Sequence, residues 1–282
     1  MTLSIIMINY NAPAVTEQAI YSIVQLSPKI SFEIILVENG TQRIQKEFLH
    51  LSNLRVFQTE NKGFSHACNF GAEEAQGEYL LFLNNDTIMQ KDTLEKSIFR
   101  FQQEKNTGVL GVRILNPDGT LDHGCKRGFP TPLASFCYFT KLDKIFPNSS
   151  LCGAYRQTTL REDTVGDVDA VSGCYLMIRQ ALFAEIGGFD ETFFMYGEDL
   201  DLCYRIKKAG YRIFYYGEVF ILHLKGESGL HKGSEKVIRA FYESMEIFYR
   251  KHYQNKYCWF INKLVLTAIK AKEKIALHSL KK

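Results

Sequence analysis

Short apolar runs that end in polar residues recur through the first half of the chain. They predict buried strands over residues 3–8, 32–37, 54–58 and 79–83, and amphipathic spacing predicts helices over 13–26, 65–74 and 92–105. Alternation of strand and helix is typical of an α/β protein, here with a Rossmann-like, mostly parallel central sheet flanked by helices. The polar residues that follow the strands should then meet at one edge, where open sheets of this kind bind ligands.

The run over 79–83 ends most sharply, in Asn84, Asn85, Asp86 and Thr87. A carboxylate beside amide and hydroxyl oxygens offers hard ligands suited to Mg²⁺ or Mn²⁺ carrying a phosphate. The same residues also suit a capped turn, because Asn, Asp and Thr often begin helices and turns. The stretch therefore indicates either a metal site or a turn.

The pattern resumes after an irregular interval at residues 120–165, which we expect to be either a lid that orders around a ligand or plain scaffold. A strand is predicted over 109–115, before this interval, and others over 168–178, 213–216 and 219–222 after it. A helix begins at Glu198-Asp199 and ends at Gly210. Carboxylates in a first helical turn are favoured by the helix dipole, so this pair is either capping or functional. His223, at a strand end, is either a ligand or an ordinary histidine.

Charge is spread unevenly along the 282 residues, whose net charge is +3. From Tyr249 onward there are nine Lys or Arg against the single acidic Glu273, so the preceding part is net negative. A mildly acidic body argues against a nucleic-acid groove. There is no GxGxxG after the first strand and no GxxxxGK[ST] motif, which disfavours a dinucleotide fold and a P-loop.

The seven cysteines have no zinc-ligand spacing and are interpreted as reduced thiols of a cytoplasmic protein. The first strand begins almost at the N-terminus, and no apolar run reaches the roughly 18 residues of a membrane span, so we expect neither a signal peptide nor a spanning helix.

The C-terminal region predicts two helices. The first, over 234–253, has an apolar face that should pack on the body. Beyond it, apolar residues alternate with lysines: Trp259, Phe260, Leu264, Val265, Ile269 and Leu277 with Lys256, Lys263, Lys270, Lys272, Lys274, Lys281 and Lys282. This composition favours an amphipathic helix at an anionic membrane surface. The alternative is a basic helix that covers the catalytic domain or a partner in a homodimer.

Eight segments, in order along residues 3–230, resemble glycosyltransferase family 2, inverting enzymes of the GT-A fold, and most closely its rhamnosyltransferase-like bacterial branch. They are IIMINYN (5–11), LVENG (36–40), NKGFSHACNFG (61–71), LFLNNDT (81–87), SGCYLMIR (172–179), GGFDE (187–191), FMYGEDLDLCYRIKKAG (194–210) and His223. Each segment alone is weak evidence, whereas eight in the family's order are specific.

The resemblance implies roles for thirteen residues. Asp86 and His223 would bind the divalent cation, Mn²⁺ or Mg²⁺, and Asp199 would be the general base with Glu198 beside it in the site. The nucleotide-sugar would contact Tyr10, Asn11, Glu38, Asn61, Gly63 and Asn85, and the acceptor would contact Gly173, Asp201 and Arg205. Two positions depart from the family: Glu38 is one methylene longer than the usual Asp, and the DxD motif is reduced to Asn84-Asn85-Asp86.

The resemblance also implies an organisation and an activity. Residues 1–232 would form the GT-A catalytic domain, with a nucleotide-binding half over about 1–115 and an acceptor-binding half over about 116–232, and 233–282 a basic helical extension. The activity would be metal-dependent inverting transfer from dTDP-rhamnose or a UDP-sugar to a glycan or lipid-linked glycan, in polysaccharide biosynthesis at the cytoplasmic face of the bacterial inner membrane. The alternatives are an inactive nucleotide- or glycan-binding member and a sugar-phosphate nucleotidyltransferase.

Overall fold

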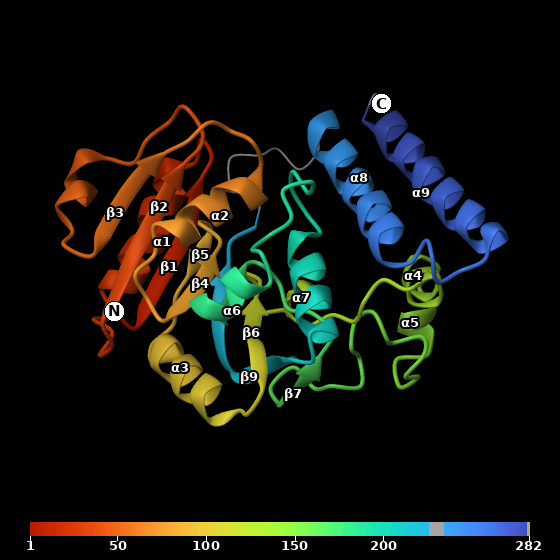
Figure 1. Ribbon diagram of the computed structural model, residues 1–282, viewed down its shortest axis with the longest axis horizontal. Helices are drawn as coiled ribbons and strands as arrows, with labels where there is room; N and C mark the ends of the chain where they lie inside the picture. The colour runs from red at the N-terminus through yellow and green to blue at the C-terminus, as the bar shows by residue number, and fades with distance from the viewer. Residues whose placement is uncertain (226–233, 281–282) are drawn as a thin grey trace.

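One mixed sheet passes through the molecule in the computed structural model, which describes residues 1–225 and 234–280 (Figure 1). Within these residues the strand order is β3-β2-β1-β4-β8-β6-β9-β5, with β7 paired to the far side of β9. The strands are β1 (Leu3–Asn9), β2 (Phe32–Glu38), β3 (Leu54–Gln58), β4 (Tyr79–Leu83), β5 (Thr87–Ile88), β6 (Thr107–Leu115), β7 (Val165–Val168), β8 (Tyr175–Arg179) and β9 (Arg212–His223).

Helices cover the sheet and extend it at one end. They are α1 (Pro13–Val24), α2 (Phe64–Glu73), α3 (Thr93–Gln103), α4 (Pro132–Phe139), α5 (Leu142–Ile145), α6 (Gln180–Glu185), α7 (Glu198–Lys208), α8 (Glu235–His252) and α9 (Trp259–Ser279), with 3₁₀ turns η1 (Lys46–His50) and η2 (His123–Cys125). The α2 helix packs on β1 and β2, whereas α3 and α7 pack on β6 and β9. The pair α8–α9 lies beside the sheet, with α4 and α5 near its end (Figure 1).

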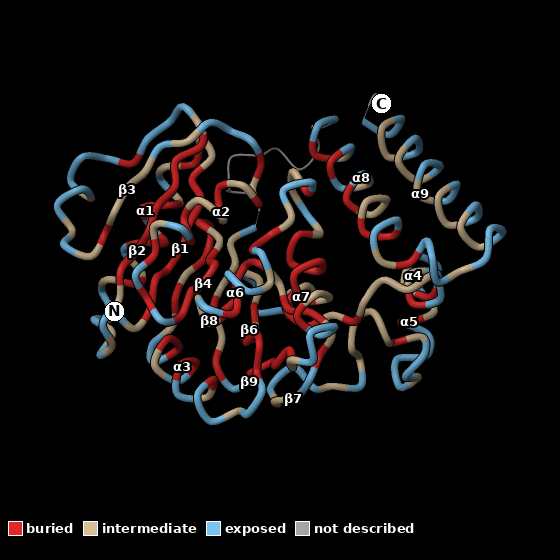
Figure 2. Tube along the Cα trace, viewed as in Figure 1, coloured by how far each residue is buried: buried red, intermediate tan, exposed pale blue. Residues whose placement is uncertain are grey.

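The strands β3, β2, β1 and β4 are parallel, as the apolar runs predict. Every residue of β1 and β4 is buried, which Figure 2 shows as the red centre of the sheet. Burial of both faces explains why these strands read as continuous apolar runs. Their shared direction brings the polar residues after each strand to one edge, so the expected α/β sheet is confirmed.

Two antiparallel additions complete that edge. The β8 strand pairs with β4 so that Tyr175 lies opposite Leu83, which places Gly173 and Cys174 beside Asn84. The short β5 pairs with β9 so that Thr87 lies opposite His223. This pairing brings Asp86 to His223 across 137 residues of sequence.

Three sequence expectations need correction. Residues 168–178 form two strands, β7 and β8, joined by a loop; the run looked continuous because Ala170 and Val171 in that loop are buried. The strands expected over 213–216 and 219–222 are one strand, β9, which bulges where its partner in β6 passes from Val112 to Arg113. The irregular interval contains η2, α4 and α5, which are too short to show helical periodicity.

The C-terminal helices are present where the pattern predicts them. Ser234 caps α8, accepting a hydrogen bond from the Val237 N–H, and Val237 and Phe248 are buried. The expected domain boundary at 232/233, together with Lys281 and Lys282, lies outside the described residues. In residues 1–225 and 234–280, no helix combines the length and apolarity that a bilayer span requires.

Candidate active site

A cleft of about 810 Å³ runs along the polar edge of the sheet and continues between α4, α8 and α9. Of the thirteen residues expected at the site, seven line it: Tyr10, Asn61, Asn85, Gly173, Glu198, Asp199 and His223. Asn11, Glu38, Gly63, Asp86, Asp201 and Arg205 do not line this cleft. The six therefore need separate structural accounts.

Asp86 and His223 meet at one corner of the cleft. The His223 Nε2 lies 3.1 Å from Asp86 Oδ1, and its Nδ1 lies 3.2 Å from Oδ2 of Asp122. Lys225 also pairs with Asp122, at 3.2 Å. The imidazole is thus held between two carboxylates, and Asp86 is only 1% exposed.

This environment favours a charged imidazole. Burial alone would lower the pKa of His223, but contact with Cys174 and the hydrogen bonds to Asp122 and Asp86 raise it well above its ordinary value. Because burial raises the pKa of the Cys174 thiol, that thiol stays neutral and the two carboxylates carry the effect. Burial opposes ionisation of Asp122 as well, yet its hydrogen bonds to His223 and the Gly124 N–H lower its pKa overall.

The Asp86–His223 corner offers some, but not all, of the ligands that a divalent cation needs. A carboxylate oxygen and an imidazole nitrogen 3.1 Å apart are suitable donors for Mn²⁺ once the imidazole has released its Nε2 proton. In the described part of the chain, however, no group of three or more His, Cys, Asp or Glu side chains is placed to hold a metal. A bound cation would therefore take most of its ligands from a diphosphate and water.

The Asp199 carboxylate lies deep in the cleft and is fixed from three sides. Its Oδ2 accepts hydrogen bonds from Arg127 Nη2 at 2.6 Å and from the Gly173 N–H at 2.9 Å, while Oδ1 accepts one from the Leu200 N–H at 2.7 Å. Gly197, with φ of 79°, turns the chain into α7 in a conformation that favours glycine. This start positions the carboxylates of Glu198 and Asp199 in the cleft.

Glu198 directly precedes Asp199, but its surroundings favour the protonated, neutral form of its carboxyl group. It is buried, and its Oε2 has no hydrogen-bond partner. Burial, together with the charge of Asp199, raises the pKa of Glu198 to about 8. Near neutral pH the site therefore contains a carboxylate held by Arg127 beside a neutral carboxylic acid.

The other end of the cleft is polar and lies at the parallel strand ends. Tyr10, Asn39, Asn61 and Asn85 line it, following β1, β2, β3 and β4 respectively. Asn85 Nδ2 donates to Thr16 Oγ1 at 2.8 Å, which leaves its carbonyl oxygen for a ligand. The Asn39 Oδ1 is buried without a partner, so it too is free to bind one.

Asn11 and Glu38 build the neighbouring loop instead of facing the cleft. Asn11 Oδ1 accepts hydrogen bonds from the N–H groups of Thr41 and Gln42, and Glu38 accepts one from the Ile44 N–H and pairs with Arg43. Gly63 has φ of 113°, and a Cβ there would lie 2.7 Å from the Phe194 carbonyl oxygen. The structure gives these three residues architectural contacts, and their direct contact with a nucleotide stays a prediction.

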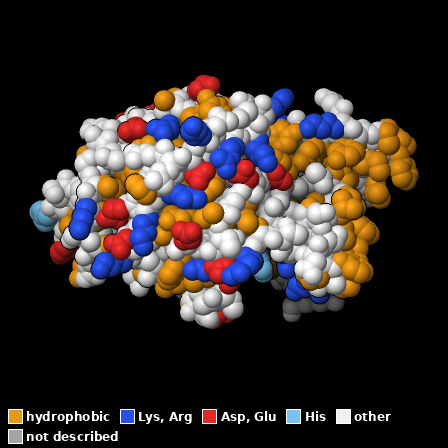
Figure 3. All heavy atoms as spheres, turned by 90° about the horizontal axis from the view of Figure 1, so that it is seen from below, with side chains coloured by type: hydrophobic (Ala, Val, Ile, Leu, Met, Phe, Trp, Pro, Cys, Tyr) orange, Lys and Arg blue, Asp and Glu red, His pale blue; other side chains and the backbone are white. Residues whose placement is uncertain are grey.

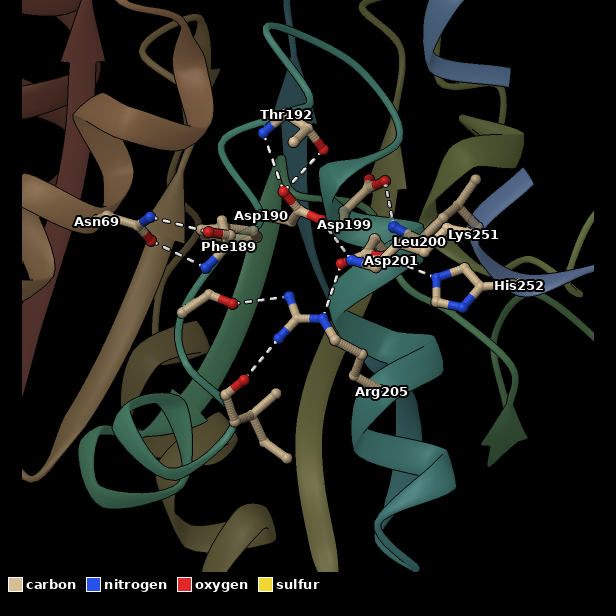
Figure 4. Close-up of polar contacts among 12 residues, drawn as sticks. Asn69, Phe189, Asp190, Thr192, Asp199, Leu200, Asp201, Arg205, Lys251 and His252 are labelled. Atoms are coloured by element: carbon tan, nitrogen blue, oxygen red, sulfur yellow. Dashed lines mark hydrogen bonds and ion pairs between the residues drawn. The ribbon is translucent and has the colours of Figure 1, made fainter. Parts of the chain in front are cut away.

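Asp201 and Arg205 also have partners inside the protein (Figure 4). Asp201 is fully buried; Oδ1 contacts Lys251 Nζ and His252 Nε2, each at 2.7 Å, and Oδ2 contacts Arg205 Nε at 2.7 Å. Arg205 also donates to the carbonyl oxygens of Ile186 and Gly188. The structure therefore uses this pair to join α7 to α8, and their expected contact with an acceptor stays untested.

Sequence reasoning missed Arg127, Asp122 and Asn39. The first two fall in the interval without periodicity, where no pattern marks a residue as functional. Arg127 is fixed by backbone hydrogen bonds to Ala170, and the neighbouring Asp199 raises its pKa although burial alone would lower it. Asn39 lies within the LVENG segment, so its place after a buried strand was an available signal.

Comparison with known proteins gives one family for most of the chain. Residues 4–183 match the model of glycosyl transferase family 2, and residues 163–225 match that of the N-terminal domain of galactosyltransferase. The chain is 26% identical over 240 residues to an N-acetylglucosaminyl-diphospho-decaprenol L-rhamnosyltransferase of Mycobacterium tuberculosis, covering 80% of this chain and 77% of that protein. It is 28% identical over 204 residues to rhamnosyltransferase WbbL of Escherichia coli K12, covering 68% and 72%.

Solved structures agree on the fold. The structure of GalNAc-T7 with UDP, GalNAc and Mn²⁺ superposes with a TM-score of 0.61 at 16% identity, over 97% of this chain but only 55% of that one. The mannosyltransferase PcManGT from Pyrobaculum calidifontis with GDP-Man and Mn²⁺ gives 0.59 at 16%, over 99% and 72%. The GT-A fold and the family resemblance expected from sequence are both confirmed.

The first prediction concerns the buried ion cluster. Asp201→Asn should destabilise the fold by about 3 kcal/mol, the low end of the cost of breaking a buried pair, because Lys251 and Arg205 stay partly solvated. Urea unfolding would measure this, with Asp167→Asn, a half-exposed partner of Arg212, as control at about 0–1 kcal/mol. Equal stability of Asp201→Asn and wild type would contradict the assignment.

The cluster also predicts a pH dependence. Burial raises the pKa of Asp201, but hydrogen bonds from His252 and Lys251 and the charge of Arg205 lower it from an ordinary 3.8 to about 2. A lowered folded-state pKa stabilises above the unfolded value and loses that contribution as pH falls through the folded one. The difference between wild type and Asp201→Asn should therefore shrink from about pH 4 to pH 2.

The second prediction concerns Glu198, whose pKa is shifted the other way. Between its ordinary pKa of 4.5 and about 8, the folded protein holds a proton that the unfolded chain releases, so wild-type stability falls as pH rises through that window. Glu198→Gln lacks this titration, and its advantage over wild type should grow by at most about 1.4 kcal/mol per pH unit. Urea unfolding from pH 5 to pH 8 measures it; a pH-independent difference would overturn the proposed neutral state.

Proposed function

The chain belongs to glycosyltransferase family 2, and we propose that it transfers a sugar, with inversion, from dTDP-rhamnose or a UDP-sugar to a hydroxyl of a glycan or lipid-linked glycan. The observation that carries the proposal is the Asp199 carboxylate, buried in the cleft between its polar and apolar ends. The names of the M. tuberculosis and E. coli relatives support rhamnose and a role in bacterial cell-surface polysaccharide assembly.

The reaction requires one proton acceptor on the acceptor side. As the acceptor oxygen bonds to the anomeric carbon, its proton passes to Asp199, and the bond from that carbon to the diphosphate oxygen breaks with its electron pair leaving on the diphosphate. Arg127 and the Gly173 N–H hold the Asp199 carboxylate in one orientation. Glu198, neutral and with a free oxygen, can donate a hydrogen bond to the acceptor sugar.

The donor would lie along the polar strand ends, with its base and ribose near Tyr10, Asn39 and Asn61. Asp86 and His223 would then hold Mn²⁺ or Mg²⁺ where the diphosphate ends. A bound cation supplies neutralisation of the charge that develops on the leaving diphosphate. The retention of Asp86, Asp199 and His223 disfavours the inactive, binding-only alternative, and a nucleotidyltransferase lacks support from the family match.

The third prediction separates the two carboxylates by role. Asp199→Asn should keep Mn²⁺-dependent binding of the nucleoside diphosphate but lose at least about 100-fold in turnover, as expected for a missing general base. Asp86→Asn should lose the Mn²⁺-dependent part of that binding. Calorimetry with UDP and dTDP, with and without Mn²⁺, and a transfer assay measure the two effects. Normal turnover by Asp199→Asn would refute its role as base.

We also propose that the protein binds the cytoplasmic face of the inner membrane through one end of the molecule. Hydrophobic side chains gather there in Figure 3, over α4, α5 and α9. The exposed ones on these helices are Leu133, Phe136, Phe139, Ile145, Trp259, Phe260, Leu264 and Ile275. Lysines flank the apolar side chains of α9, as is common in helices that lie at anionic interfaces. The membrane face expected from α9 alone thus extends to α4 and α5.

The fourth prediction tests this surface. Trp259→Ser with Phe260→Ser should weaken sedimentation with vesicles rich in anionic lipid by at least about tenfold, because both side chains are mostly exposed and would insert at the interface. Tyr21→Ser, a change at an exposed aromatic residue of α1, serves as control. Salt should weaken binding of the wild type. If the wild-type protein did not sediment with anionic vesicles at low salt, the proposed membrane binding would be disproved.

A further inference from the structure

The cleft divides into two parts of different chemistry. Beyond Asp199 its walls change from asparagines to the apolar side chains of three helices: Phe136 and Phe139 of α4, Met245 of α8, and Val265 and Ile269 of α9. A free oligosaccharide exposes hydroxyl groups that such walls cannot satisfy. An aliphatic chain, by contrast, would bury its surface there favourably.

The α9 helix faces this apolar part because α8 fixes its orientation. Tyr249 of α8 donates a hydrogen bond to Asn262 Oδ1 at 2.7 Å, and Arg239 pairs with Glu273 at 3.5 Å. Residues three and four apart share a helix face, so holding Asn262 and Glu273 towards α8 turns Ile261, Val265, Ala268 and Lys272 into the cleft. The apolar part of the cleft between α4, α8 and α9, called the groove below, is therefore lined on one side by a helix that α8 holds in a fixed orientation.

The groove opens onto the exposed apolar surface already described. Phe136, Phe139 and Leu264 both line the cleft and are between 38% and 58% exposed. A chain leaving the groove between α4 and α9 would pass directly onto that surface, whose hydrophobic side chains are shown in Figure 3. One end of a ligand could therefore remain in a membrane while the other reaches Asp199.

Two lysine side chains line the cleft beside the groove and could bind a charged group attached to an aliphatic chain. Lys236 Nζ lies 4.7 Å from the centre of the Phe194 ring, and Lys272 Nζ lies 4.2 Å from that of Phe139. Both line the cleft, and the Arg239–Glu273 pair places them at the same end of the α8–α9 hairpin. Positive charge on the wall of the cleft complements a diphosphate.

We propose that the groove between α4, α8 and α9 binds the isoprenoid chain of a lipid-diphosphate-linked acceptor, with Lys236 and Lys272 at its diphosphate. The assignment rests on the proposed transferase function and specifies where its acceptor lies. The sugar attached to the diphosphate then extends towards Glu198 and Asp199.

Binding of farnesyl diphosphate, measured by calorimetry on the full-length protein without donor, tests the groove independently of turnover. Farnesyl diphosphate should bind at least about tenfold more tightly than geranyl diphosphate, which is one isoprene unit shorter, and more tightly still than inorganic diphosphate. Equal affinity for the three would overturn the proposal, because it would show binding of phosphate alone.

A matched pair of variants on α9 locates the ligand. Ala268 and Ala271 are both exposed, but only Ala268 lines the cleft. Ala268→Phe should therefore weaken farnesyl diphosphate at least about tenfold while leaving inorganic diphosphate unchanged, whereas Ala271→Phe should change neither more than about twofold. Lys272→Gln should weaken both diphosphates, and Lys270→Gln, exposed on the same helix, neither. Equal losses within either pair would refute the site.

A second pair covers the case in which Ala268→Phe does not fold. Phe139→Ser removes an exposed groove residue of α4 and should weaken farnesyl diphosphate several-fold, while Phe99→Ser, exposed on α3, should not. If the wild-type protein transferred sugar from neither dTDP-rhamnose nor a UDP-sugar while farnesyl diphosphate still bound in the groove, the proposed function would fail and the groove would stand. If the protein transferred sugar to a free glycan but did not bind farnesyl diphosphate, only the proposed role of the groove would be overturned.

Discussion

The buried carboxylate of Asp201 is the interaction on which the site depends. It lies in the first turn of α7, the turn that carries Glu198 and Asp199, and it pairs with Lys251 and His252 at the end of α8. Arg205 extends the same network to the carbonyl groups of Ile186 and Gly188. Because α8 also forms the apolar wall of the cleft, one ion cluster fixes both the catalytic carboxylates and the surface opposite them. Removing its charge should therefore disturb acceptor binding together with stability.

The first turn of α7 also shows how position on a helix gives three acidic residues different surroundings and different charges. Successive helical residues are rotated by about 100°, so Asp199 and Asp201 point to nearly opposite sides of α7. Asp199 faces the cleft and pairs with Arg127, whereas Glu198 lines the cleft with no partner for its Oε2. Asp201 faces α8. A charged base, a neutral acid and a structural anion thus arise within four residues from differences in burial and partner. An acid and a base side by side suit a reaction in which one acceptor sugar must be both held and deprotonated.

Sequence predicted the parallel half of the fold well because each of its strands is buried on both faces and ends in polar residues. Through the family resemblance it also assigned Asp86, Asp199 and His223 to one site; in the structure Asp199 and His223 line the same cleft and Asp86 contacts His223. It failed where contacts depend on distant pairing: Arg127 and Asp122 reach the site only after β6, β8 and β9 assemble, and nothing local marks them. It also could not decide which first-turn carboxylate faces the cleft, because all three are compatible with an N-terminal helix position. Asp201 and Arg205 were therefore expected at the acceptor, although the structure uses them between helices.

The cleft has a polar end and an apolar end, and each follows from how the neighbouring elements bury their side chains. Parallel strands must bury their sides and can expose polar groups only at their ends, so the sheet edge provides amides and carboxylates for a nucleotide and its cation. The α8–α9 hairpin has no sheet to cover and packs only one side of α9, which leaves apolar side chains both in the groove and on the outer surface. Exposed apolar area on this scale is costly in water unless something covers it. An acceptor whose sugar is polar and whose carrier is apolar matches both ends of the cleft, and a membrane beneath α4, α5 and α9 would cover the remainder.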